Sequence, residues 1–210
     1  IRNANDAISL SQTAEGALGK VGDMLQRMRE LAVQSANATN GTSDRANLNA
    51  EYQALGTEVV RTLANTKFNG LAILGANAGT LSFQVGANAG ETVDVVTTRL
   101  DTAGSITGAT GGAITDATLA GTAMTNIDTA LTAVNGERAL YGATQNRFDA
   151  IIGTLQVAAE NQAAAKSRIT DADFAAETAN LSRAQILQQA GSAMVAQANQ
   201  LPQAVLALLR

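Results

Sequence analysis

The sequence predicts a mainly α-helical protein, an elongated antiparallel helical bundle or coiled coil with a β-hairpin beside it. Apolar residues recur at spacings of three and four over most of the chain, which is the pattern of helices with one buried face. Of the 210 residues, 3% are aromatic and one is Pro. Because aromatic side chains bury the most area per residue, we expect helices that pack at close range through small side chains.

Composition excludes several function classes. The chain has no His and no Cys, which removes imidazole bases, thiolate nucleophiles, disulfides and the usual zinc ligands. Its formal net charge of −4 argues against nucleic-acid binding, because such proteins carry a basic face. No apolar run approaches the ~18 residues of a membrane span, so we expect no membrane insertion.

The N-terminus has no signal-peptide architecture and opens in a polar segment without Met. We therefore expect a chain that was trimmed at its N-terminus and a protein that is exported without a cleaved signal peptide.

Residues 1–100 are expected to hold the N-terminal core helices and the hairpin. A helix over 1–38 should end at the turn dipeptide Asn40-Gly41, and a second helix should span 44–65. The period then changes to two, with a turn near Gly86–Gly90, which predicts a β-hairpin. The seam of the first helix comprises Ala14, Leu18, Val21, Leu25, Met28, Ala32 and Ser35, with Ile1, Ala4 and Ile8 before it.

The next part, residues 101–125, is rich in Gly and Thr and is expected to be a short variable segment of loop or weak strands. Ile114 should therefore be exposed. Residues 126–170 then form the C-terminal core helix, with Leu155 in its buried face. Thr170 and Asp173 resemble a capping box, so we expect a break near 168–171.

The last part, residues 171–210, carries a regular heptad. Small and long apolar residues alternate on one helix face, which is the pattern of a coiled-coil seam. We find no partner for this seam elsewhere in the chain, so its partner is either a segment missing from this chain or part of other molecules. The 210-residue chain alone is not expected to form filaments. The seam comprises Ala184, Leu187, Gly191, Met194, Ala198, Leu201, Val205 and Leu208.

No motif predicts chemistry, a cofactor or a metal. Gly16, Gly19 and Lys20 lack the spacing of a phosphate loop and lie within a predicted helix. Asp171 and Asp173 lack the remaining ligands of a calcium loop and are better explained as carboxylates at a helix N-terminus. We therefore expect a protein that is not an enzyme.

Several segments resemble bacterial flagellins, in the order of that family. The clearest is LQRMRELAVQSANATN, residues 25–40, and the others are RNANDAISLSQTAEGAL (2–18), FNG (68–70), QVGANAGETVDV (84–95), GATQNRF (142–148) and SRAQILQQAGSAMVAQANQLPQAVLALLR (182–210). The resemblance covers the chain except about residues 101–125. It implies a rod of N-terminal helices packed on a C-terminal helix, and an extracellular filament subunit that self-assembles for motility.

The resemblance also implies partners and site residues. The partners are other flagellin subunits, a flagellar export chaperone, the filament cap and the vertebrate Toll-like receptor that senses flagellin. The receptor-binding residues that it implies are Gln26, Arg27, Leu31 and Glu51, with Arg147 on the C-terminal helix. An alternative is a surface-displayed flagellin-like protein that binds a polysaccharide or host ligand through residues 101–124.

Overall fold

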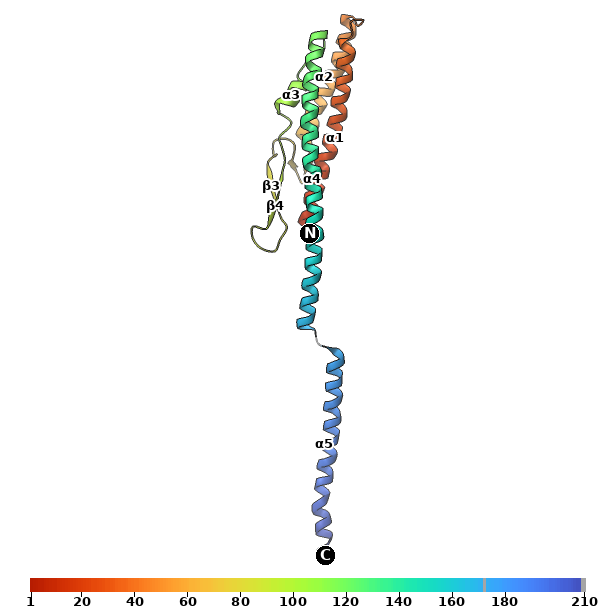
Figure 1. Cartoon of the computed structure of the whole chain (residues 1–210), viewed down its shortest axis with the longest axis vertical. Helices are drawn as coiled ribbons and strands as arrows, with labels where there is room; N and C mark the ends of the chain where they lie inside the picture. Colours follow the sequence, from red (N-terminus) through yellow and green to blue (C-terminus); the bar gives the residue numbers. More distant parts are fainter. Residues whose placement is uncertain (172, 209–210) are drawn as a thin grey trace. The chain divides into compact units, whose positions relative to one another are not determined.

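The computed structural model describes residues 1–171 and 173–208, with side chains for 1–171 and 173–199 (Figure 1). It contains two compact units, Ile1–Val157 and a second that begins at Ala158. The elements in chain order are α1 (Arg2–Ala36), α2 (Thr42–Asn65), β1 (Lys67–Phe68), β2 (Leu71–Ala72), β3 (Thr80–Gln84), β4 (Thr92–Val96), α3 (Gly104–Thr110), α4 (Ala117–Thr170) and α5 (Phe174–Leu208). The predicted fold class, mainly α with a β-hairpin, is confirmed.

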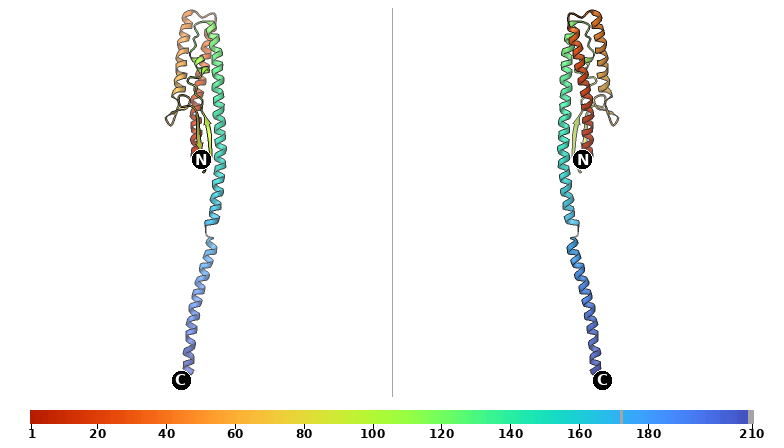
Figure 2. Two further views of the ribbon diagram at one scale, coloured as in Figure 1. Left: turned by 90° about the vertical axis from the view of Figure 1, so that its left-hand side faces the viewer. Right: turned by 90° about the vertical axis from the view of Figure 1, so that its right-hand side faces the viewer.

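Helix α1 is the centre of the first unit, with α2 on one side and α4 on the other (Figure 2). Every predicted seam residue from Ala14 to Ser35 is buried. Before Ala14, the seam continues through Ser11, Ala7 and Ala4 rather than through Ile8 and Ile1, because steps of three, four and three lead to those positions. Ser11 is compatible with burial because its hydroxyl donates to the carbonyl of Ala7 at 2.9 Å.

The predicted helical hairpin of α1 and α2 is confirmed. The backbone N–H of Gly41 donates to the Asp44 carboxylate at 3.1 Å, which anchors the start of α2. From α2, Arg45 reaches back to the end of α1 and donates to the carbonyls of Ser35 and Asn37 at 3.0 and 3.2 Å. These carbonyls lie where a helix end leaves acceptors unpaired, so Arg45 fixes the turn between the two helices.

Two antiparallel hairpins follow α2. The predicted one is confirmed, with Leu81 opposite Val95 and Phe83 opposite Val93. Phe83 also meets Phe148 of α4 edge-on, with ring centroids 6.0 Å apart, which ties this hairpin to α4. The second hairpin, β1–β2, was not predicted. Its turn is Asn69-Gly70, whose φ angles of 48° and 82° suit Asn and Gly.

The prediction of loop or weak strands over 101–124 is wrong. Helix α3 spans Gly104–Thr110, and α4 begins at Ala117. We name residues 103–114 the strap. Side chains distant in sequence bind its backbone: Tyr52 donates to the carbonyl of Ala109, Gln53 to Gly112, Asn126 to Gly108 and Ser35 to Ile114, while Asn49 accepts the Ile114 N–H. A low-complexity sequence does not reveal such contacts.

The expectations that Ile114 is exposed and that Leu155 is buried are also wrong. Ile114 in the strap is fully buried, whereas Leu155 is only partly buried. The reason is that Phe148 is the last fully buried residue of α4, so the core of the first unit ends before Leu155.

The break between α4 and α5 is confirmed, but its cap differs from the expected one. Asp173 accepts the backbone N–H groups of Ala175 and Ala176 at 3.0 and 3.2 Å, which makes it the N-cap of α5. The Thr170 hydroxyl instead donates to the carbonyl of Lys166, within α4.

Truncation of Ile114 tests the strap. Ile114→Ala should lower the free energy of unfolding by about 2–4 kcal/mol, because it opens a cavity in the core. Leu155→Ala should cost less than about 1 kcal/mol, because this side chain stays in partial contact with water. The measurement is urea unfolding followed by tyrosine fluorescence, since both tyrosines lie in the first unit. Equal losses for the two variants would contradict the structure.

The two tyrosines predict alkaline behaviour. Burial raises the pKa of Tyr52 from its ordinary value of 10.0 to about 12, and burial together with the nearby Glu137 carboxylate raises the pKa of Tyr141. The folded state holds these protons more tightly than the unfolded state. The contribution of the tyrosines to the free energy of unfolding is therefore complete below pH 10 and is lost as pH rises towards 12. As pH rises above 10, the tyrosinate absorbance of the folded protein should stay low. It should increase only at the higher pH at which helix content is also lost. A urea-unfolded control should ionise near pH 10, and early ionisation in the folded protein would refute this burial.

Candidate functional site

The candidate site lies on the exposed face of α1. The same periodicity that buries Leu25, Met28 and Leu31 turns Gln26 and Arg27 towards solvent. The Arg27 side chain can therefore contact side chains of both α1 and α2.

Arg27 is the centre of a cluster of ion pairs. Its Nη2 lies 2.9 Å from Glu51 Oε1 on α2, and its Nη1 lies 3.0 Å from Glu30 Oε2 one turn along α1. Hydrogen bonds to Glu30 and Glu51 raise the pKa of Arg27 above its ordinary value. The Arg27 side chain remains 50% exposed. Exposed pairs of this kind add little to stability, so the cluster is better placed for recognition than for holding the fold.

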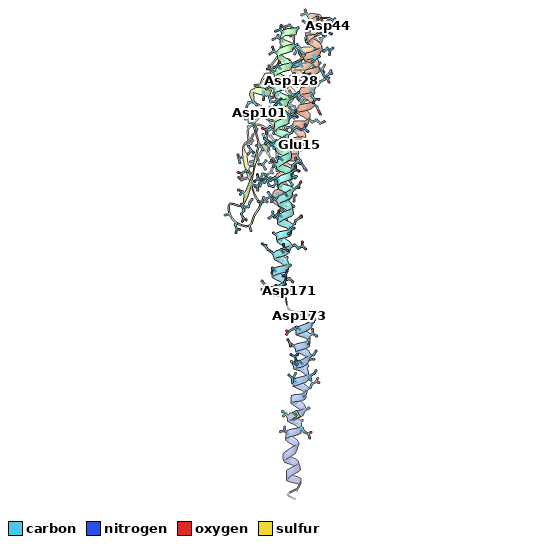
Figure 3. The ribbon with its side chains drawn as sticks, in the orientation of Figure 1. Glu15, Asp44, Asp101, Asp128, Asp171 and Asp173 are labelled. Atoms are coloured by element: carbon cyan, nitrogen blue, oxygen red, sulfur yellow. The ribbon has the colours of Figure 1, made fainter. Side chains whose placement is uncertain are left out.

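A separate ion pair links α1 to α4. Arg29 donates to Asp128 from the other side of α1, with Nε 2.8 Å from Oδ1. Further along, Glu15 accepts from Gln145 at 2.9 Å and lies 3.9 Å from Arg138. Since higher numbers on α4 meet lower numbers on α1, the two helices run antiparallel (Figure 3).

The five receptor-binding residues implied by the resemblance do not all lie on one surface. The structure brings Arg27 and Glu51 together in an ion pair. Gln26 is exposed on the adjoining face of α1, where it lines a hollow with Arg29 and Val33. Leu31 is 1% exposed and belongs to the core. Leu31 therefore supports the surface from within. Arg147 is exposed, but it lies about 28 Å beyond Asp128 along α4, at about 1.5 Å per residue.

Sequence reasoning missed the ion pair of Arg27 with Glu30 and the separate pair on the other side of α1. Glu30 follows Arg27 by three residues, and this spacing on a helix could have identified the pair. The Arg29–Asp128 pair joins residues far apart in the chain, so no local sequence pattern predicts it.

The seam of α5 is the second candidate site. Its described members are all exposed, including Leu187 at 64% and Met194 at 70%. Leu201, Val205 and Leu208 lie outside the residues whose side chains are described. Between residues 184 and 208 the sequence has no charged residue, so this stretch of α5 offers neutral and apolar groups only.

Neither a metal centre nor a membrane span is evident in the described residues. Within residues 1–171 and 173–208, no group of three or more Asp or Glu side chains is arranged to hold a metal ion. Across that same part of the chain, no helix is long and apolar enough to cross a membrane.

Comparison with known proteins decides the family. The profile of the "Bacterial flagellin N-terminal helical region" matches residues 1–78, and that of the "Bacterial flagellin C-terminal helical region" matches residues 124–209. The chain belongs to the bacterial flagellin family. Its flagellin profiles cover α1, α2, the β1–β2 hairpin and most of α4 and α5, and they leave the strap unmatched.

Individual flagellins agree with this assignment. A flagellin of Halalkalibacterium halodurans is 49% identical over 209 residues, which are 100% of this chain and 77% of that protein. The flagellar filament 33 kDa core protein of Treponema phagedenis is 38% identical over 228 residues, covering 99% of this chain and 78% of that protein. The crystal structure of Bacillus cereus flagellin matches with a TM-score of 0.65 and 34% identity, over 78% of this chain and 94% of that chain.

Membership fixes the general role. Flagellins are structural proteins, not a family of enzymes, and they polymerise with other flagellin subunits into the extracellular filament that serves motility. This chain is therefore a structural subunit of the flagellar filament.

Proposed function

We propose that this flagellin joins the filament through the seam of α5, which packs against a helix of a neighbouring subunit. The observation that carries the proposal is the exposure of Leu187 and Met194 on a helix face without charge. A helix gains most of its stability from packing of its apolar face. The small residues Ala184, Gly191 and Ala198 let a second helix approach closely, while the long residues fill the spaces between them.

Resemblance to the family extends the proposal to other partners. Before assembly, a flagellar export chaperone would bind the subunit, which would leave the cell without a cleaved signal peptide. At the growing end, the filament cap would receive it. We assign no residue of this chain to these two contacts.

Substitution on the seam tests the assembly proposal. Leu187→Asp should abolish incorporation into filaments, because it places an unpaired charge in an apolar interface. Ile186→Asp is the matched control, since Ile186 is 65% exposed and lies beside the seam rather than on it. The measurement is electron microscopy of filaments in the native organism, with circular dichroism of the purified monomers.

Both variants should keep the helix content of the wild type, because neither side chain is buried in the described structure. Normal filaments with Leu187→Asp, or equal loss with Ile186→Asp, would refute the seam as an assembly surface.

We further propose that a host Toll-like receptor recognises the monomer through the surface formed by Gln26, Arg27 and Glu51, with Leu31 beneath it. Arg27 supports this because its guanidinium is half exposed and held in one geometry by two carboxylates. Arginine held in this way is a common interface anchor. A standard interface covers about 800 Å² per partner, a patch roughly 30 Å across. Arg147 lies about 28 Å beyond Asp128 along α4, at or beyond the edge of such a patch, so it stays in the proposal only as what the resemblance implies.

Arg27 gives the sharpest test of recognition. Arg27→Ala should weaken receptor signalling by at least about tenfold, as for an interface hot spot. Arg61→Ala is the matched control, because Arg61 is also an exposed arginine in an ion pair, with Glu58 of its own helix. The measurement is a cell reporter assay on folded monomers.

A charge exchange separates recognition from structure. The double variant Arg27→Glu with Glu51→Arg keeps an ion pair between α1 and α2 but reverses the charges offered to the receptor. It loses the pair with Glu30, but exposed pairs add little to stability, so the melting temperature should stay near that of the wild type while signalling is lost. Signalling retained by both Arg27 variants would remove this surface from the proposal.

The alternative of a polysaccharide or host-ligand binder gains no support from the described residues. In the strap, the carbonyls of Gly108, Ala109, Gly112 and Ile114 already accept side-chain donors of the same chain.

A further inference from the structure

The chain has few side chains that an oxidant can attack. It contains four Met and two Tyr, but no Cys, Trp or His. Both tyrosines are buried. A two-electron oxidant that meets the folded subunit therefore reacts with thioether sulfur, and the exposure of each Met decides where.

The four methionines differ sharply in exposure. Met28 is fully buried in the core, and Met24 and Met124 are partly buried against it. Met194 on the α5 seam is 70% exposed. Its neighbours one turn away are Ala190, Gly191, Gln197 and Ala198, and the three small ones leave the sulfur open to solvent.

We propose that Met194 is an oxidation site that controls assembly: a hydroperoxide converts its thioether to the sulfoxide in the free subunit, and the oxidised subunit no longer joins the filament. This inference rests on the proposed role of the α5 seam. In the reaction, the sulfur attacks the peroxide, an S–O bond forms and the O–O bond breaks. Sulfur loses two electrons, the peroxide gains them, and water or an alcohol leaves.

The effect on assembly follows from the chemistry of the seam. A sulfoxide oxygen is a strong hydrogen-bond acceptor, whereas the adjacent seam residues Gly191 and Ala198 have no side-chain donor. Gln197, which has one, lies beside the seam rather than on it. Burial of an acceptor without a donor opposes association. In the assembled filament the neighbouring helix covers Met194, so oxidation should act on free subunits and spare assembled ones.

The experiment uses monomers obtained by dissociation of filaments from the native organism. Hydrogen peroxide is added, the oxidation of each Met is followed by peptide mass spectrometry, and the monomers are returned to filament seeds. Met194 should oxidise at least about tenfold faster than Met28. The monomer concentration needed for growth should rise by at least about tenfold, and treatment with methionine sulfoxide reductases of both stereospecificities should reverse it.

The control variant is Met194→Leu, which removes the sulfur and nearly preserves the volume. It should assemble normally and resist peroxide. Loss of its assembly after peroxide, or no faster reaction of Met194 than of Met28, would overturn the proposal. If Met194→Leu fails to assemble untreated, the reductase step decides: wild-type assembly that does not recover after Met194 is reduced overturns it.

Oxidation of intact filaments separates this inference from the proposed seam. Slower oxidation of Met194 in filaments than in monomers, together with impaired growth of oxidised monomers, supports both. Equal oxidation refutes the seam as a covered interface. Protection in filaments, combined with normal growth of oxidised monomers, refutes the oxidation switch and leaves the seam in place.

Discussion

The first unit depends on the burial of one stripe of small and medium side chains along α1. From Ala4 to Ser35, each step of three or four residues leads to a side chain that water does not reach. Such small side chains make favourable contacts only where neighbours come close, so α2 and α4 lie on either side of this helix (Figure 2). The ion pairs at Arg27 and Arg29 follow from that approach and do not cause it.

Local periodicity made much of the fold predictable. The helices and the main hairpin repeat their burial pattern within a few residues, so α1, α2 and the β3–β4 pair could be anticipated. The strap could not, because its order comes from donors such as Tyr52 and Asn126 that lie far away in the chain. Gly- and Thr-rich composition describes the freedom of a segment by itself and says nothing of the side chains that bind its backbone.

The candidate sites show the same limit. In α1 and in α5, apolar residues follow similar spacing, yet Met28 is buried and Met194 is exposed. Periodicity identifies the apolar face of a helix, but the rest of the molecule decides what covers that face. Resemblance to flagellins placed Arg27 and Glu51 together, which the geometry supports, but it could not show that Leu31 lies beneath the surface.

The contacts of the strap have an evolutionary consequence. Its donors bind main-chain carbonyls, and every amino acid supplies the same carbonyl. An exposed position such as Thr107 can therefore accept many substitutions without loss of the contacts that order the segment. Only the few inward side chains, among them Ile106, Ala109 and Ile114, are constrained by packing. This region can diversify its outer surface while the scaffold beneath it stays the same.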